Sequence, residues 1–275
     1  MTDKNLQNCI VFLDSGAGGL TYLGAYAELN PRPLLLYVAD KKNFPYGKKT
    51  KNELVSILIE LTGRIKKHFS PALITLACNT ASVSALAELR QNFPDTDFVG
   101  TVPAVKPAML ASKKKHIAVL GTERTLQDDY IQHIAETAAG DCAITRLAAG
   151  ELVDFVERRF EYSDKAEKIA VAKKYIKAAR ESGADALVLG CTHFLFLLDE
   201  FKEAAPPDIA VFDSMSGVCG RIENIFAKND KAKTPAGHSK NLLLVTGAEN
   251  AEEQWSQRAA RFNLERFKPR DWDSA

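Results

Sequence analysis

Short apolar runs alternate along the chain with longer segments in which apolar residues recur at helical spacing. Lys51–Phe69 is a segment of the second kind, with Leu54, Leu58, Leu61 and Ile65 three or four positions apart. Such spacing predicts an amphipathic helix with one buried face. Apolar runs of strand length that alternate with helices predict a parallel sheet joined by crossover helices. The pattern therefore predicts the α/β fold class.

The plan of strands and helices occurs twice. In the first half, the predicted strands are Cys9–Asp14, Pro33–Asp40, Ala72–Ala77 and Phe98–Val102. In the second half they are His116–Gly121, Ala143–Ala148, Ala186–Gly190 and Asp208–Asp213. A tail follows, with a further run at Asn241–Gly247 and a helix after it. A cysteine follows the third strand of each half.

The repeated plan predicts two similar domains, each a mainly parallel sheet of about four to five strands flanked by helices. The chain has 275 residues, which suits two domains of about 100–150 residues each. We place the first domain at 1–101 plus 211–275 and the second at 102–210. The strand-like run in the tail must pair with other strands, and we expect it to join the sheet of the first domain. In open α/β sheets, ligands bind beyond the carboxyl ends of the strands. We therefore expect an active site in a cleft between the domains.

Composition excludes several classes of partner. A formal net charge of +1 gives no electrostatic reason to expect binding to nucleic acid or to an anionic membrane surface. No apolar run reaches the ~18 residues of a membrane span, so we expect a cytoplasmic protein. The five cysteines contain no CxxC pair and no Cys/His spacing suited to zinc. We therefore expect free thiols and no metal site.

Two of the cysteines end strand-like runs and precede hydrogen-bonding residues. They are Cys78 in "LACNTAS" and Cys191 in "VLGCTHF". Inverting a tetrahedral carbon by proton transfer needs an acid on one face and a base on the other. A thiol with a pKa near 8.5 reaches both protonation states near neutral pH. Two thiols that approach one ligand from opposite sides would suit this chemistry.

Each candidate also has a purely structural interpretation. A single buried cysteine usually packs as a small apolar side chain, and we assign Cys9, Cys142 and Cys219 to that role. Asp14 is a suitable helix cap, which is compatible with assisting a thiol. His193 is either an exposed loop histidine or a partner of the Cys191 thiolate. The glycines after Asp14 lack the Lys-Ser/Thr of a phosphate-binding loop, so we do not expect nucleotide binding.

Four motifs resemble those of the glutamate racemases, a branch of the aspartate/glutamate racemase superfamily. They are "DSGAGGL" from Asp14, "FPYGKKT" from Phe44, "ACNTAS" from Ala77 and "LGCTHF" from Leu189. They occur in the family's order and spacing, and the similarity extends from about residue 10 to about residue 265. "VLGTERT" from Val119 and "LVDFVE" from Leu152 resemble two weaker family segments.

The resemblance implies cofactor-independent interconversion of L- and D-glutamate, which supplies D-glutamate for peptidoglycan synthesis. It implies that Cys78 and Cys191 are the acid/base thiols, Cys78 serving the D-enantiomer and Cys191 the L-enantiomer, with help from Asp14 and His193. It also implies a possible homodimer and, with so short a segment before the first strand, no need for a peptidoglycan-precursor activator. The substrate-binding positions that it implies are Asp14, Ser15, Tyr46, Gly47, Asn79, Thr80, Thr122, Thr192 and His193.

The chain departs from the family pattern in three places. "KKN" at Lys41–Asn43 replaces a segment with a small residue and an arginine, and Leu195 stands where a proline is usual. The segment before Glu157 lacks the usual cysteine and proline, which leaves the role of Glu157 open. Aspartate racemase is the nearest alternative, because one methylene is worth only about 1–3 kcal/mol of discrimination. A hydrolase using Cys191 with His193, or a non-catalytic amino-acid-binding protein, would leave Cys78 without a chemical role.

Overall fold

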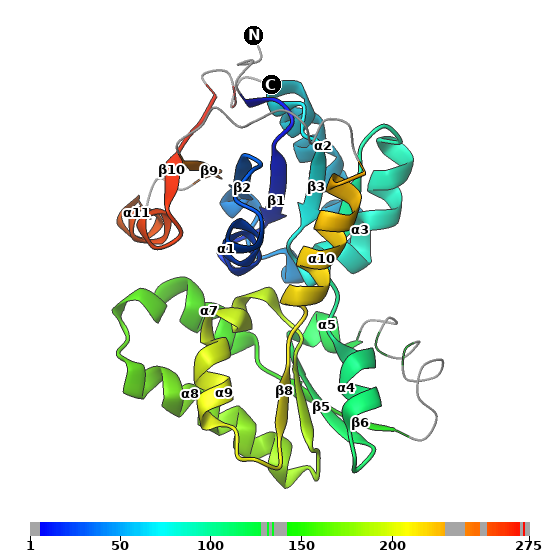
Figure 1. Cartoon of the computed structure of the whole chain (residues 1–275), viewed down its shortest axis with the longest axis vertical. Coiled ribbons are helices and arrows are strands. Elements are labelled where there is room, and N and C mark those ends of the chain that lie inside the picture. Colours follow the sequence, from blue (N-terminus) through cyan, green and yellow to red (C-terminus); the bar gives the residue numbers. More distant parts are fainter. Residues whose placement is uncertain are drawn as a thin grey trace. The chain divides into compact units, whose positions relative to one another are not determined.

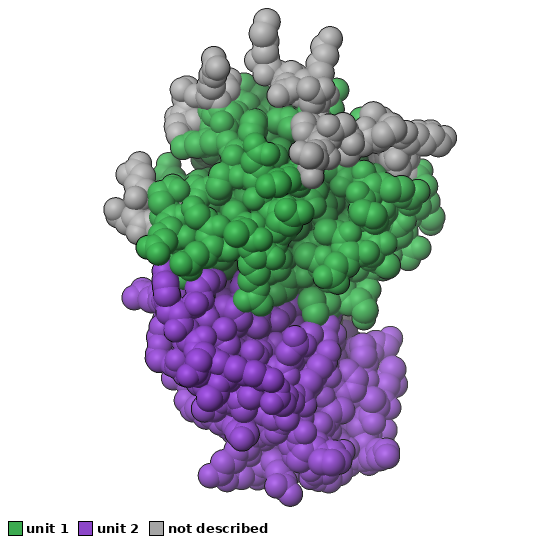
Figure 2. Space-filling view, turned by 60° about the vertical axis from the view of Figure 1, so that its left-hand side comes forward, with its two compact units in different colours: residues 1–101, 215–275 green, residues 102–214 purple. Residues whose placement is uncertain are grey.

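The computed structural model describes residues 6–127, 131, 134, 142–228, 240–247, 252–269 and 272. The chain divides into two compact units (Figure 2). Unit 1 consists of Met1–Thr101 and Met215–Ala275, and unit 2 of Val102–Ser214. None of the helices in the described part of the chain combines the length and apolar character needed to cross a membrane.

Unit 1 is built on a parallel sheet with the strand order β10-β9-β2-β1-β3-β4 (Figure 1). β1, β2 and β3 are entirely buried, as expected for strands that helices cover on both faces. The register pairs Asp14 with Ala39 and Leu13 with Leu76, so the carboxyl ends of these three strands meet at one edge. The strands are β1 (Ile10–Asp14), β2 (Leu35–Ala39), β3 (Leu73–Leu76), β4 (Phe98–Gly100), β9 (Asn241–Val245) and β10 (Leu264–Arg266).

The helices of unit 1 follow local signals in the sequence. In α2 (Lys51–Phe69), the Thr50 hydroxyl accepts from the Glu53 N–H, and the Glu53 carboxylate accepts from the Thr50 N–H. This reciprocal cap satisfies two backbone donors that a helix start leaves open. The other helical segments are α1 (Leu20–Leu29), η2 (Lys41–Asn43), η3 (Tyr46–Lys48), α3 (Asn79–Asn92), α10 (Met215–Phe226) and α11 (Glu252–Arg261).

Unit 2 has a parallel sheet with the order β6-β5-β7-β8. Its strands are β5 (His116–Gly121), β6 (Ala143–Ala148), β7 (Ala186–Leu189) and β8 (Ala210–Phe212). The helical segments are α4 (Val105–Ala111), α5 (Glu123–Gln127), α7 (Gly150–Arg158), η4 (Phe160–Tyr162), α8 (Lys165–Glu181), η5 (Thr192–Leu197) and α9 (Leu198–Ala204). Every predicted strand is present within one or two residues of its expected ends, which confirms the α/β class.

The predicted number of strands is wrong for unit 1. Its sheet has six strands in the described residues, because β10 adds to the outer side of β9. β10 has the sequence Leu264-Glu265-Arg266 and only Leu264 is buried. Three residues with a single apolar position carry no strand signal, and this segment is extended because it pairs with β9.

Gly19 allows α1 to begin close to the end of β3. A Cβ atom on Gly19 would lie 2.5 Å from the Cβ of Ala77 and 2.9 Å from the Ala77 carbonyl oxygen. We expect Gly19→Ala to lower the free energy of unfolding by about 1–3 kcal/mol, because backbone cannot move aside easily. Gly220→Ala in α10 is the matched control, since its Cβ would meet nothing within 4 Å. It should raise stability by about 0.5–1 kcal/mol, and denaturant unfolding of both variants checks the pair.

Candidate active site

The predicted site residues form two clusters, one in each unit. In unit 1 they follow the carboxyl ends of β1 and β3 or lie in the loop after β2. In unit 2 they follow β5 and β7, which are neighbouring strands with Leu120 opposite Leu189. Residues far apart in sequence therefore share one sheet edge within each unit, because parallel strands end on the same side.

Asp14 is the last residue of β1 and is completely buried. Its Oδ1 accepts from the Ser15 N–H at 2.6 Å and its Oδ2 accepts from the Gly19 N–H at 2.8 Å. Gly19 is the N-cap of α1, so Asp14 binds the helix start from five residues upstream and is not itself the cap. The backbone donors stabilise a carboxylate at the positive end of this helix.

Cys78 occupies the N-cap position of α3, in extended conformation. Its side chain is nearly buried, with 8% of the residue exposed. The Ser82 N–H and hydroxyl both donate to the Cys78 carbonyl oxygen at 2.9 Å, which holds the first turn in place. Asn79 and Thr80 are the first two residues of the helix and are buried beside the thiol. A thiol at a helix N-terminus is in the environment that favours a thiolate.

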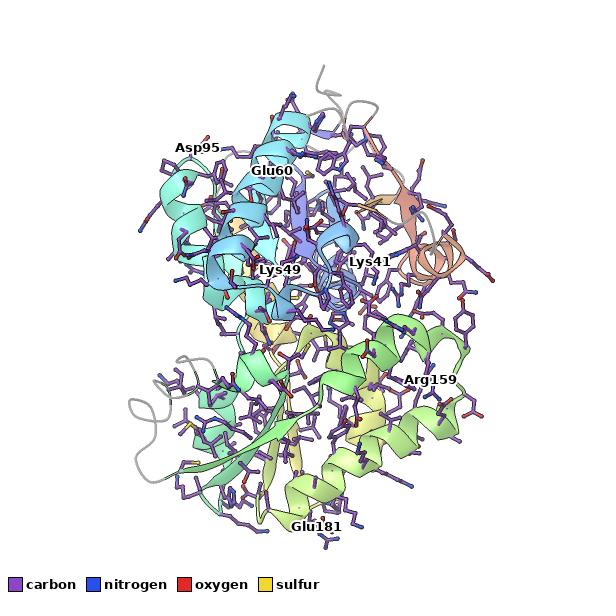
Figure 3. The ribbon with its side chains drawn as sticks, turned by 180° about the vertical axis from the view of Figure 1, so that it is seen from behind. Lys41, Lys49, Glu60, Asp95, Arg159 and Glu181 are labelled. Atoms are coloured by element: carbon purple, nitrogen blue, oxygen red, sulfur yellow. The ribbon has the colours of Figure 1, made fainter. Side chains whose placement is uncertain are left out.

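The loop after β2 is held by Asp40, a buried residue that the sequence analysis missed. The Tyr46 hydroxyl donates to Asp40 Oδ2 at 2.8 Å, and the Asn43 amide donates to both carboxylate oxygens. Burial and the nearby Asp40 charge raise the pKa of Tyr46 well above its usual value, so the phenol remains a neutral donor. Lys41 and Lys49 mark the two ends of this loop in Figure 3. The Tyr46 hydroxyl is therefore engaged with Asp40 in this structure.

In unit 2, Cys191, His193 and Glu157 form a chain of contacts. Cys191 Sγ lies 3.9 Å from His193 Nδ1, and His193 Nε2 lies 2.8 Å from Glu157 Oε1. The histidine and the glutamate are each 4% exposed. Burial lowers the pKa of His193, but hydrogen bonds and charge interactions with Cys191 and Glu157 outweigh it and raise this pKa to about 10. At neutral pH the imidazole is therefore positively charged, 3.9 Å from the Cys191 sulfur.

The two cysteines differ in the helical segment that follows them. Cys78 precedes the α-helix α3, whereas Cys191 precedes the 3₁₀ segment η5. The α-helix α9 begins only at Leu198. The positive charge beside this sulfur therefore comes from a side chain, His193, and not from an α-helix dipole. Thr192, the first residue of η5, is 2% exposed and follows the thiol directly.

Thr122 follows β5 at the same sheet edge as Cys191. Its hydroxyl lies 3.0 Å from the Thr125 hydroxyl and accepts from the Thr125 N–H at 3.3 Å, as a cap of α5 does. The structure thus brings Thr122, Cys191, Thr192 and His193 into unit 2, while Asp14, Ser15, Tyr46, Gly47, Asn79 and Thr80 belong to unit 1. Their substrate contacts remain predictions.

The remaining cysteines have packing roles, as expected. Cys9, Cys142 and Cys219 are buried, and burial raises the pKa of the Cys9 thiol to about 12. None of the five cysteines, all of which the structure describes, forms a disulfide. Within the described ranges, no group of three or more His, Cys, Asp or Glu side chains is arranged to hold a metal ion.

Comparison with known proteins identifies the family of the chain. The family model described as Asp/Glu/Hydantoin racemase matches residues 25–219. The glutamate racemase of Treponema pallidum (strain Nichols) is 35% identical over 253 residues, which cover 91% of each chain. The glutamate racemase of Sphingopyxis alaskensis is 38% identical over 219 residues, covering 78% of this chain and 81% of the relative.

Solved structures of similar fold are also glutamate racemases or their relatives. Escherichia coli glutamate racemase, crystallised with L-glutamate and the activator UDP-MurNAc-ala, has a TM-score of 0.84 and 27% identity. The similarity covers 94% of this chain and 97% of that one. An aspartate racemase homologue from Pyrococcus horikoshii shares the fold, at a TM-score of 0.56 and 19% identity over 79% of this chain. This chain therefore belongs to the Asp/Glu/Hydantoin racemase family, and within that family to the glutamate racemases.

Proposed function

We propose that this chain interconverts L- and D-glutamate by a cofactor-independent, two-base mechanism. The observation that carries the proposal is the equivalent placement of two thiols in a member of this family. Cys78 follows the third strand of unit 1, and Cys191 follows the third strand of unit 2 in chain order. A hydrolase or a simple binding protein would use one such cluster or neither, whereas a two-base racemase needs both.

Cys78 is the acid/base thiol of the first cluster in this proposal. Asp14 is assigned to assist it, and the N-terminus of α3, which Cys78 caps, supplies positive electrostatic potential that stabilises the thiolate. Ser15, Asn79 and Thr80 are assigned as hydrogen-bond donors to substrate carboxylates. The backbone N–H groups of Tyr46 and Gly47 are added to this set, because the Tyr46 hydroxyl already donates to Asp40.

Cys191 is the acid/base thiol of the second cluster. The His193 imidazolium stabilises its thiolate, and the Glu157 carboxylate stabilises the imidazolium. This gives Glu157 the role that its sequence context left open: it acts through His193 as a positioning residue. Thr192 and Thr122 are assigned as polar contacts to the substrate at the same sheet edge.

The chemistry follows from these assignments. With L-glutamate, the Cys191 thiolate takes the Cα proton and becomes a thiol, while the Cys78 thiol delivers a proton to the opposite face and becomes a thiolate. The reverse transfer converts D-glutamate. The neighbouring carboxylate opposes carbanion formation, so fixed donors around it must stabilise the developing charge. Excluding water from the substrate strengthens those interactions.

The biological setting is part of the proposal. We assign the D-glutamate product to peptidoglycan synthesis and the enzyme to the cytoplasm, and we treat the two units as the two domains. A homodimer is proposed from the family resemblance, and sedimentation would test it.

The test is exchange of the α-proton in D₂O without any added cofactor. The protein is incubated separately with L-glutamate and L-aspartate, and optical activity and Cα deuterium are followed together. Loss of optical activity with deuterium gain on glutamate is the expected result. The same result on aspartate alone would keep the mechanism and overturn the substrate, and binding without exchange would overturn the mechanism.

A further inference from the structure

The end of β9 is hydrogen-bonded to the loop that carries Tyr46 and Gly47. Thr246 follows β9, and its N–H donates to the Ala39 carbonyl oxygen at 2.9 Å. Its hydroxyl donates to Asp40 Oδ1 at 2.8 Å and accepts from the Lys42 N–H at 3.1 Å. One hydroxyl can do both at once. A residue that lies 206 positions after Asp40 in the chain thus contacts the first residues of the loop.

Asp40 connects this hydroxyl to the rest of the first cluster. Its N–H donates to the Asp14 carbonyl oxygen at 2.7 Å. Its second carboxylate oxygen, Oδ2, accepts from the Tyr46 hydroxyl at 2.8 Å. Asp40 is 2% exposed and Thr246 is 8% exposed, so water does not readily replace these partners. Thr246, Asp40 and Tyr46 form a continuous hydrogen-bonded chain, which we call the β9 latch.

The backbone after Thr246 also lies against the loop. Gly247 has φ +59°, and a Cβ atom on it would be 3.0 Å from Lys42 Cα and 3.3 Å from Lys42 N. This close approach brings the end of β9 within reach of the Lys42 N–H. The register that pairs Ala39 with Val245 places Thr246 beside Asp40. The sheet itself therefore sets the position of the latch.

We propose that Thr246 is a positioning residue for glutamate binding, which holds the loop of residues 40–50 so that the backbone of Tyr46 and Gly47 faces the substrate. The inference rests on the proposed function of that loop. Removing the hydroxyl takes one donor from Asp40 and the acceptor from the Lys42 N–H. Without these hydrogen bonds, the loop adopts its binding-competent conformation for a smaller fraction of the time. The apparent affinity for the substrate then falls by that fraction.

The experiment compares Thr246→Val with Thr246→Ser, which retains the hydroxyl. Thr62→Val is the matched control, because Thr62 is fully buried in α2 and its hydroxyl has no hydrogen-bond partner among the described residues. Thr246→Val should raise KM for glutamate about tenfold and lower kcat by less than about threefold, since both thiols are untouched. Without substrate, amide exchange across residues 40–50 should be faster in Thr246→Val alone.

The outcomes separate the latch from the proposed function. Unchanged KM in Thr246→Val overturns the inference, whatever the amide exchange shows. An equal rise in Thr62→Val, or none of the lost affinity recovered by Thr246→Ser, also overturns it, because the effect would then be general destabilisation. If the wild-type protein does not racemise glutamate, the proposed function fails, and unchanged amide exchange would show separately that the hydroxyl does not hold the loop.

Discussion

Replacing either Cys78 or Cys191 by alanine should reduce racemisation of glutamate by about 10³-fold or more, because one face of Cα then lacks its proton donor or acceptor. The fold should survive, since each cysteine lies at the end of a strand and the change removes only a sulfur atom. Exchange in D₂O gives a second readout. Any exchange that remains in Cys78→Ala should label L-glutamate, and any that remains in Cys191→Ala should label D-glutamate.

The controls are the cysteines that have no place in the mechanism. Cys142→Ala and Cys219→Ala remove buried thiols outside both clusters and should retain nearly full activity. Circular dichroism and denaturant unfolding establish that all four variants are folded. Substantial racemisation by a folded Cys78→Ala or Cys191→Ala protein would refute the two-base assignment.

Changes at His193 and Glu157 should give the next largest losses. His193→Asn should lower kcat by about 10²-fold or more, with the larger effect on the conversion of L-glutamate, because Cys191 loses its imidazolium. Glu157→Gln keeps a hydrogen-bonding group of similar size but removes the charge. We expect kcat to fall by about 3- to 30-fold, the difference between a hydrogen bond to a charged group and a hydrogen bond to a neutral one.

The pH profile distinguishes a role in catalysis from a role in folding. Hydrogen bonds and charge interactions with Cys191 and Glu157 raise the pKa of His193 to about 10, so the imidazolium persists through neutral pH and is lost as pH rises through that value. Removing the Glu157 charge lowers this pKa. The alkaline decline of kcat for L-glutamate should therefore move to lower pH in Glu157→Gln.

Glu151→Gln is the matched control for this effect. Glu151 lies on the same helix, α7, but is exposed and pairs with Lys174. Its replacement should leave both kcat and the alkaline limb unchanged. An alkaline limb that stays in place in Glu157→Gln, or moves equally in Glu151→Gln, would rule out the proposed action of Glu157 through His193.

Local signals in the sequence were sufficient for most helices and strands. α2 has the predicted ends, because its Thr50–Glu53 cap and its apolar face lie in the segment itself and in the residue just before it. The two thiols were found because each combines a strand end with a short polar motif. β10 was missed because its three residues become a strand only through hydrogen bonds to β9.

Contacts between distant segments were beyond sequence reasoning. Asp40 ends an apolar run just as Asp14 does, and that signal was available, but nothing local indicates that it binds Tyr46 and Thr246. Likewise, the sequence places His193 next to Cys191 but does not show that Glu157, on α7, is 2.8 Å from the imidazole. Whether a polar group is exposed or buried against a partner depends on which segments the fold brings together.

The sequence by itself determined the α/β class, the repeated order of strands and the two thiol positions, because periodicity and strand-end motifs are properties of neighbouring residues. The tertiary structure decided which side chains support those thiols. It placed an α-helix start after Cys78 and a buried histidine–glutamate pair beside Cys191, and it brought the end of β9 against the loop after β2. These features depend on strand register and burial, which only the assembled sheets define.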